Sequence, residues 1–426
     1  MYETNLLCKN LKKKFEKPWY NNSISIVTSY TSMLPYDENS YSRMLEGYTV
    51  IVATSGSISI YRIPDLVRDL RREGANVIVG MSQSSAAMVS PEVMKWASER
   101  DVVTEITGRI EHITLFTENP DKKILLIAPA SYNTIGKMAN GITDSIPSLF
   151  FSFAFGHGIK TVVAPAMHKS MMENPINLEN VKKLRDLGVR FVEPIYDDEK
   201  AKLGSNASIV DEVCRATHET LAGKRIMIIS GRGEEPIDPI RSITNAGSGF
   251  TGVWAAKNAY RMGASMITYI GNTQYDLPGY VNYIHAKSMD EFEDRSLKEI
   301  EKGYDAVIVT AALPDFKVSE RSDKKYSSDE TLRLTLEPRE KLIYKLRKKF
   351  NGLLVAFRLT DDINEDAISH FEGKVDLAVV NTYEKDPFGK VRNSYRFAWK
   401  NGSKILHDAP KPMMTRMLLE QISSMI

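Results

Sequence analysis

Short apolar runs, each followed by a segment of helical periodicity, recur along most of the chain. In the first half the runs lie at 48–53, 76–81, 124–128 and 161–164. After the first run, apolar residues return every three or four positions from Ile60 to Leu70, which is the spacing of one face of a helix. Strands that are apolar throughout and alternate with helices indicate a parallel sheet covered on both faces. The first half is therefore predicted to be a doubly wound α/β sheet.

The same alternation begins again after Ala222-Gly223-Lys224. The predicted strands of the second half lie at 225–230, 265–270, 305–310, 353–357 and 377–380. Two further segments, 395–399 and 404–406, flank Asn401-Gly402, a pair that is typical of a β-hairpin turn. We therefore predict a second, Rossmann-like α/β sheet with an appended β-hairpin.

The length of the chain supports two domains, because 426 residues exceed what one hydrophobic core usually holds. We predict one domain over residues 47–222 and another over 223–426. Residues 1–46 are polar and show no sustained period, so we assign them to an N-terminal extension of unknown role.

The composition excludes several classes of protein. The net charge of +2 offers no basic surplus for nucleic acid. The two cysteines, Cys8 and Cys214, are far apart and have no spacing typical of a zinc site or a disulfide framework. The most apolar segment, 146–155, is much shorter than a membrane span, and no signal-peptide core follows the basic N-terminus. We expect a cytoplasmic protein with no nucleic-acid or membrane partner.

Small hydroxyl and amide side chains follow the predicted strands of the first half. In open α/β sheets, ligands bind beyond the carboxyl ends of the strands. The residues concerned are Ser57, Ser82, Ser131 and Asn133, together with the segment 165–168. One such loop alone is more often a helix cap, but four at the same edge predict a site for the phosphate of a flavin.

Over about residues 46–215 the chain resembles the homo-oligomeric flavin-containing cysteine decarboxylases. The resemblance implies a flavodoxin-like fold in which Ser57, Ser82, Ser131 and Asn133 hold FMN. It also implies that His112, within Glu111-His112-Ile113-Thr114-Leu115, acts as an acid or base beside the flavin. Sites of this family are completed by a neighbouring subunit, which implies a homo-oligomer built from trimers or larger.

Two departures from the family pattern concern the reacting groups. His168 in Pro165-Ala166-Met167-His168 stands where most members have Asn to bind the substrate carboxylate. Bacterial members carry a proton-donating Cys on a flap, whereas the matching segment 199–204 has none. His168 or Lys202 is therefore the candidate proton donor. An oxidative-only decarboxylase that releases an enethiol and a non-catalytic flavoprotein regulatory subunit remain alternatives.

Glycines at 247, 249 and 252 have the spacing of a dinucleotide-binding loop. They do not follow the first strand of their half directly, and Ile270-Gly271-Asn272 supplies no acidic residue for a ribose. The loop is therefore predicted to bind phosphate rather than NAD.

Over most of residues 224–424 the chain resembles the phosphopantothenate–cysteine ligases. The resemblance assigns nucleotide or substrate contacts to Arg241, Asn245, Asp315, Lys324, Lys325 and Phe357, and assigns Mg²⁺ to Asp315. By themselves, the two lysines would fit a solvated turn equally well. Two departures, Phe250 for Lys and Glu337-Pro338-Arg339 for Asn-Pro-Asp, leave the choice between CTP and ATP open.

Together the two resemblances imply an archaeal-type bifunctional enzyme of coenzyme A biosynthesis. Such an enzyme joins 4′-phosphopantothenate to cysteine through a nucleotidyl intermediate, with CTP in most bacterial relatives. It then decarboxylates the product with FMN.

Overall fold

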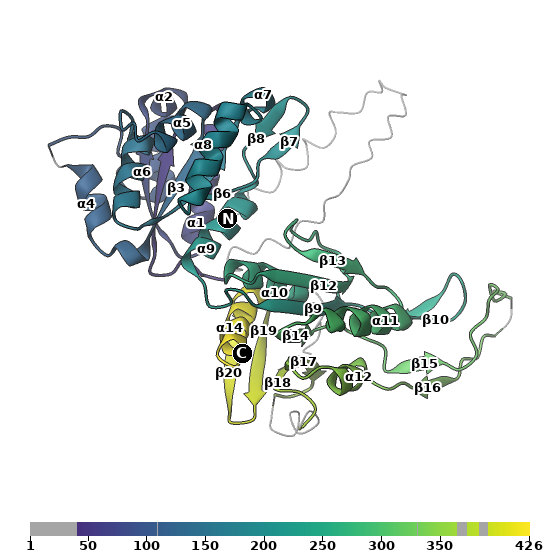
Figure 1. Ribbon diagram of the computed structural model, residues 1–426. Helices are drawn as coiled ribbons and strands as arrows, with labels where there is room; N and C mark the ends of the chain where they lie inside the picture. Colours follow the sequence, from purple (N-terminus) through teal and green to yellow (C-terminus); the bar gives the residue numbers. More distant parts are fainter. Residues whose placement is uncertain (1–40, 109, 330, 364–372, 383–390) are drawn as a thin grey trace, which may run out of the picture. The chain divides into compact units, whose positions relative to one another are not determined.

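The computed structural model describes residues 41–108, 110–329, 331–363, 373–382 and 391–426 (Figure 1). Most of the predicted N-terminal extension lies outside these ranges. Its last residues, from 41 to 46, are described, and Met44 and Leu45 are buried in the main apolar core. In the described part of the chain, we find no helix of the length and apolarity that crossing a bilayer requires.

The first half forms a five-stranded parallel sheet in the order β2-β1-β3-β4-β6. Its strands are β1 (Thr49–Thr54), β2 (Asn76–Met81), β3 (Lys123–Ala130), β4 (Lys160–Pro165) and β6 (Arg190–Phe191). Numbered along the chain, this is the order 2-1-3-4-5, which is the flavodoxin-like arrangement. The predicted fold class of this half is confirmed.

Helices cover both faces of this sheet because alternate strand residues point to opposite sides. One apolar core packs the sheet against α1 (Ile63–Arg72), α3 (Pro91–Ser98) and α9 (Asn206–Thr217). The core of the other face includes α5 (Tyr132–Ala139), α6 (Ile146–Gly156) and α8 (Pro175–Asp186). The short helices α2 (Gln83–Met88), α4 (Glu111–Thr117) and α7 (Lys169–Met172) lie in the connections.

The second half forms an eight-stranded sheet in the order β13-β12-β9-β14-β17-β18-β19-β20. The strands are β9 (Arg225–Gly231), β12 (Met266–Asn272), β13 (Asn282–His285), β14 (Ala306–Val309), β17 (Leu353–Thr360), β18 (Leu377–Thr382), β19 (Arg392–Trp399) and β20 (Gly402–Pro410). The first six run parallel in the Rossmann order 3-2-1-4-5-6, and the last two are an antiparallel hairpin. The predicted Rossmann-like sheet with an appended hairpin is confirmed.

Helices flank both faces of this second sheet. On one face α10 (Phe250–Arg261) and α14 (Lys411–Ser423) contribute to the same apolar core as α9 of the first half. On the other face a separate core contains residues of α11 (Met289–Glu299) and α12 (Leu342–Lys349).

Short antiparallel ribbons were not predicted. They are β5 (Met167–His168) with β8 (Lys200–Lys202) and β7 (Ile195–Asp197), β10 (Glu234–Pro236) with β11 (Ser242–Thr244), and β15 (Phe316–Val318) with β16 (Leu336–Pro338). Leu332, Leu334 and Leu336 alternate along the sequence as the residues of a strand do, but only Leu336 lies in β16. All three leucines are exposed, so no buried face holds the rest of the segment in a sheet.

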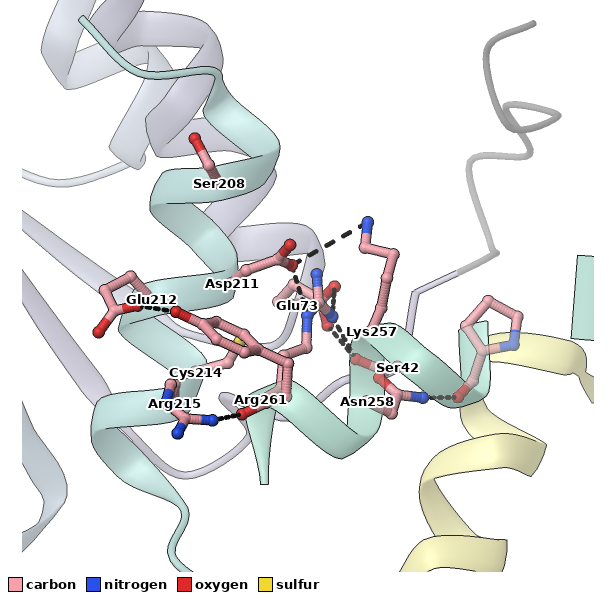
Figure 2. Close-up of polar contacts among 12 residues, drawn as sticks. Ser42, Glu73, Ser208, Asp211, Glu212, Cys214, Arg215, Lys257, Asn258 and Arg261 are labelled. Atoms are coloured by element: carbon pink, nitrogen blue, oxygen red, sulfur yellow. Dashed lines mark hydrogen bonds and ion pairs between the residues drawn. The ribbon is translucent and has the colours of Figure 1, made fainter. Parts of the chain in front are cut away.

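A buried cluster of charged residues links α10 to elements of the first half (Figure 2). Arg261 of α10 is 2% exposed and donates to Asp211 of α9 at 2.7 Å and to Glu73, which follows α1, at 2.8 Å. The hydroxyl of Ser42 accepts from Arg261 and donates to Glu73, both at 2.8 Å. Burial alone would raise the pKa of Asp211, but Lys257 and Arg261 outweigh it and hold that pKa below its usual range.

Candidate functional sites

A cavity of about 630 Å³ lies at the carboxyl ends of the strands of the first sheet. Its wall is formed by loops that follow β1, β2 and β3, and by the start of α6. The lining residues include Ser55, Gly56, Ser82, Ser84, Ser131, Asn133 and Thr134. Three predicted flavin residues, Ser82, Ser131 and Asn133, therefore share one cavity.

Two of these serines also begin helices. The hydroxyl of Ser82 accepts from the backbone N–H of Ser85, and that of Ser131 accepts from the N–H of Thr134. Each cap uses one of the free N–H groups of a helix N-terminus and leaves others pointing outward, where the helix dipole favours an anion. Capping and phosphate binding are thus compatible at the same residues.

Ser57, the fourth predicted FMN contact, does not line this cavity. Its hydroxyl donates to the carbonyl of Ala166 at 3.2 Å, which ties the first loop to the segment after β4. The structure therefore gives Ser57 a loop-joining contact rather than a place on the cavity wall.

His112 lies on α4, outside the lining of the cavity. Its ring packs edge-to-face on Phe153 of α6, with 4.7 Å between the ring centroids. Its Nδ1 atom is buried and has no hydrogen-bond partner among the described residues. Ile110 and Ile113, within two residues of His112 along the chain, are each exposed by more than a third, so His112 lies beside exposed apolar side chains.

The two candidate proton donors lie on one small ribbon. His168 of β5 pairs with Lys200 of β8, and Lys202 ends the same strand. The Nδ1 of His168 lies 2.8 Å from the hydroxyl of Ser170, and Lys202 forms an ion pair with Asp197. That pair raises the pKa of Lys202 because the hydrogen bond to Asp197 stabilises the charged amine. Both side chains are exposed, and neither lines the cavity.

A second cavity, of about 570 Å³, lies at the carboxyl ends of the central strands of the second sheet. Three predicted residues, Asn245, Asp315 and Phe357, line it together with the glycine-rich segment 247–251. The amide of Asn245 donates to the carbonyl of Leu313 at 3.0 Å, which holds its loop beside Asp315. Three of the six residues that the resemblance assigned to the ligase therefore lie at one site.

The backbone of the glycine-rich segment 247–251 packs closely against neighbouring residues and leads into α10. A Cβ on Gly247 would come within 2.9 Å of the Ala312 Cβ, and Gly249 has a φ of 83°, which favours glycine. Gly249 is the N-cap of α10, so the backbone N–H groups at the start of this helix border the cavity. This is the geometry that phosphate groups use.

Asp315 is the predicted metal ligand. Its carboxylate is exposed, and Lys341 lies 3.3 Å from it. Among the residues that the structure describes, no group of three or more His, Cys, Asp or Glu side chains could hold a metal ion. An oxygen donor suits Mg²⁺, which commonly takes one or two carboxylates together with substrate phosphates and water. Asp315 therefore fits a Mg²⁺ that arrives with a nucleotide.

Arg241, Lys324 and Lys325 do not line the second cavity. The guanidinium of Arg241 donates to Asp238 at 2.7 Å and to the carbonyl of Tyr326 at 3.2 Å. Burial would raise the pKa of Asp238, but hydrogen bonds from Ile240, Arg241 and Tyr326 lower it to about 2. Arg241 thus holds its own loop against the segment that carries the two lysines.

Several cationic residues that we did not predict line the second cavity. Arg339 forms ion pairs with Glu235 and Asp290, and Lys341 forms the pair with Asp315. Lys411, the first residue of α14, is a further cation on the wall. The sequence carries one signal for Lys411: a basic residue in the first turn of a helix opposes the helix dipole, so such a position suggests a role other than stabilising the helix.

Comparison with known proteins gives two family matches. A family described as Flavoprotein matches residues 38–218. A family described as DNA/pantothenate metabolism flavoprotein C-terminal domain matches residues 221–425.

Curated relatives align with almost the whole chain. The Coenzyme A biosynthesis bifunctional protein CoaBC of Thermococcus kodakarensis is 37% identical over 396 residues, covering 90% of this chain and 97% of the relative. The protein of the same name from Bacillus subtilis is 29% identical over 414 residues, covering 90% and 98%. A crystal structure of the C-terminal domain of a CoaBC protein is 26% identical, covers 49% of this chain and 97% of its own, and has a TM-score of 0.41.

The alignment at 37% identity spans nearly the full length of both proteins, and the two family matches follow one another along the chain. The chain therefore belongs to the bifunctional CoaBC family of coenzyme A biosynthesis proteins.

Proposed function

We propose that the second cavity joins 4′-phosphopantothenate to cysteine through an acyl cytidylate made from CTP, and that the first cavity decarboxylates the product to 4′-phosphopantetheine. As a member of its family the chain is a bifunctional phosphopantothenoylcysteine decarboxylase and phosphopantothenate–cysteine ligase. One observation carries the proposal. Each sheet has a cavity at the carboxyl ends of its strands, beside small residues at a helix N-terminus.

In the ligase reaction a carboxylate must first become a good acyl donor. Its oxygen attacks the α-phosphorus of the nucleotide and pyrophosphate leaves; the cysteine amine then attacks the acyl carbon and releases CMP. We assign the nucleotide phosphates to the glycine-rich segment 247–251 and the Mg²⁺ to Asp315. Lys341 and Arg339 are placed to offset negative charge that develops on the phosphates.

The decarboxylase takes FMN as its cofactor, in line with the flavoprotein family of this half. Bound FMN would supply a reversible hydride acceptor for the carbon that bears the thiol. We assign the FMN phosphate to the helix N-termini at Ser82 and Ser131, with Asn133 beside them. His168 would bind the substrate carboxylate, and His168 or Lys202 would return the proton.

His112 does not line the flavin cavity of its own chain, so it would act on a flavin bound in the cavity of a neighbouring copy. Its position beside the exposed apolar side chains of Ile110 and Ile113 supports an interface there. We therefore propose a homo-oligomer built from trimers or larger. A cytoplasmic location also stays a proposal.

Incubation with 4′-phosphopantothenate, cysteine and Mg²⁺, with either CTP or ATP, tests both halves in one experiment. Mass spectrometry should show phosphopantothenoylcysteine and CMP first, and then 4′-phosphopantetheine. Product with ATP alone would reassign the nucleotide. Absence of the amide with both nucleotides would refute the ligase assignment.

The oxidative-only alternative has one observation in its favour, because β8 reads Lys200-Ala201-Lys202 and carries no Cys. It predicts an enethiol, which has two hydrogens fewer than 4′-phosphopantetheine. Detection of the enethiol as the only decarboxylated product would establish this alternative.

A further inference from the structure

Two polar groups on the wall of the second cavity have no hydrogen-bond or ion-pair partner among the residues that the structure describes. The first is the hydroxyl of Tyr395 in β19. The side chain is 1% exposed and lines the cavity, and its hydroxyl has no hydrogen-bond partner among the described residues. Buried polar groups are nearly always hydrogen-bonded, so an unpaired one beside a cavity indicates a missing ligand atom.

The second group is the amine of Lys411, which begins α14 directly after β20. It lies 5.4 Å from the centroid of the Phe250 ring, and Phe250 is the first residue of α10 after the glycine-rich segment. In the described part of the chain no carboxylate forms an ion pair with Lys411, and burial lowers its pKa to about 8. The position is unfavourable for the fold, since the amine is desolvated and opposes the dipole of its helix.

The same cavity is lined by further hydrogen-bond donors besides the Tyr395 hydroxyl and the Lys411 amine. The N-terminus of α10 contributes backbone N–H groups through Ser248, Gly249 and Thr251, all of which line the cavity, whereas the N–H of Phe250 donates to the hydroxyl of Ser248 at 3.4 Å. A ligand oxyanion between α10 and α14 would accept hydrogen bonds from both sides. It would give Tyr395 a hydrogen-bond acceptor and Lys411 a counter-charge.

We propose that Lys411 and Tyr395 bind a phosphate oxyanion of the ligase substrates against the N-terminus of α10. The proposal rests on the ligase function proposed above and adds to it two binding residues on the hairpin side of the cavity. The phosphate could come from the nucleoside triphosphate or from 4′-phosphopantothenate, because both carry the same chemistry.

Direct binding measurements on the full chain with Mg²⁺ can separate these sources. Isothermal titration calorimetry with CTP, with pyrophosphate and with 4′-phosphopantothenate is carried out on wild type, Lys411→Met, Lys411→Arg and Tyr395→Phe. Lys404→Met is the matched control, because Lys404 lies exposed on β20 of the same hairpin and does not line the cavity. The melting temperature of each variant is recorded in the absence of ligand.

We expect Lys411→Met to lower the affinity for the ligand whose phosphate occupies the site by about 10- to 100-fold, which is the effect of losing one charged hydrogen bond. Tyr395→Phe should weaken it by up to about 10-fold, Lys411→Arg should retain most of the affinity, and Lys404→Met should bind as wild type does. A loss with CTP and pyrophosphate identifies a nucleotide phosphate, and a loss only with 4′-phosphopantothenate identifies that substrate. Lys411→Met should melt no lower than wild type, because it removes a desolvated charge.

Two outcomes would overturn the proposal and can be told apart. If wild type binds a ligand and Lys411→Met binds it within about twofold, the oxyanion site is refuted while the ligase function stands. If wild type binds none of the three ligands, the proposed ligase function falls and this inference falls with it.

Discussion

Replacing Arg261 with methionine tests whether the buried charged cluster stabilises the contact between α9 and α10 (Figure 2). The change removes the hydrogen bonds to Asp211, Glu73 and Ser42 but keeps an apolar side chain of similar length. Among the described residues, Glu73 then keeps the hydroxyl of Ser42 as a hydrogen-bond partner and the more distant charge of Lys257. Asp211 keeps Tyr280 at 2.8 Å and the same lysine at 4.0 Å. Breaking a buried pair in this way costs about 3–5 kcal/mol.

The free energy of unfolding can be followed in urea by tryptophan fluorescence, to which Trp254 contributes as one of four tryptophans. This indole lies beside the cluster, with the Arg261 guanidinium 5.6 Å from its ring centroid. The matched control is Arg295→Met, because Arg295 makes a partly exposed pair with Glu291 one helical turn away, and such pairs contribute about 0.3–0.5 kcal/mol. The double variant Arg261→Met/Glu73→Gln should recover part of the loss, since it removes one of the stranded charges.

The loss of stability caused by Arg261→Met should depend on pH, and its direction follows from the pKa of Asp211. In wild type the cations hold the pKa of Asp211 below its usual range, so the stability that this carboxylate contributes is present above its unfolded pKa and is lost on acidification. In the variant the effect of burial is opposed by fewer charges, and the pKa of Asp211 rises. A carboxyl with a raised pKa stabilises the fold at low pH and loses that contribution as pH increases. The deficit of the variant should therefore shrink between pH 8 and pH 5. A loss below about 1 kcal/mol at pH 8, or a deficit that grows on acidification, would refute this account.

The remaining predictions concern the two cavities. Gly252→Ala would place a Cβ against the side chain of Ser230, so we expect a loss of about 1–3 kcal/mol in a thermal or urea melt, with wild-type stability contradicting the contact. Ser131→Ala removes the cap of α5 and should lower stability by about 1 kcal/mol and weaken FMN in a fluorescence titration; unchanged FMN affinity would remove Ser131 from the flavin site. Asp315→Asn should raise the Mg²⁺ concentration needed for half-maximal pyrophosphate release, and an unaltered Mg²⁺ profile would reject Asp315 as the ligand.

The sequence predicted the features that depend on local pattern. Apolar runs predicted the central strands of both sheets, and the loops that follow these strands carry several of the residues found around each cavity. The ends of β17 and β20 were less predictable, because pairing with neighbouring strands continues after the apolar run has stopped. The edge strand β13 is largely exposed and has no apolar run to reveal it.

Contacts between segments that are far apart in the chain could not be predicted from the sequence. The place of Lys411 on the cavity wall depends on the packing of α14 beside α10, more than 150 residues earlier in the chain. The resemblance assigned a substrate contact to Arg241, but it gave no sign that Asp238 would hold this side chain inside its own loop. Such pairings depend on tertiary structure and not on local periodicity.

The charges of the two cavities explain why a chain with a net charge of +2 can handle several phosphate groups. In the first cavity the charged lining residues are Lys137 and Asp144, which form an ion pair with each other. A flavin phosphate there would depend on hydroxyls and helix N-termini, which add no net charge. The second cavity is lined by the cations Arg339, Lys341, Lys411 and Arg358 beside its helix N-terminus, which suits the triphosphate proposed to bind there. Acidic residues pair with the first two, and one of these acids, Asp315, lines the cavity itself, so phosphate binding leaves little trace in the overall composition.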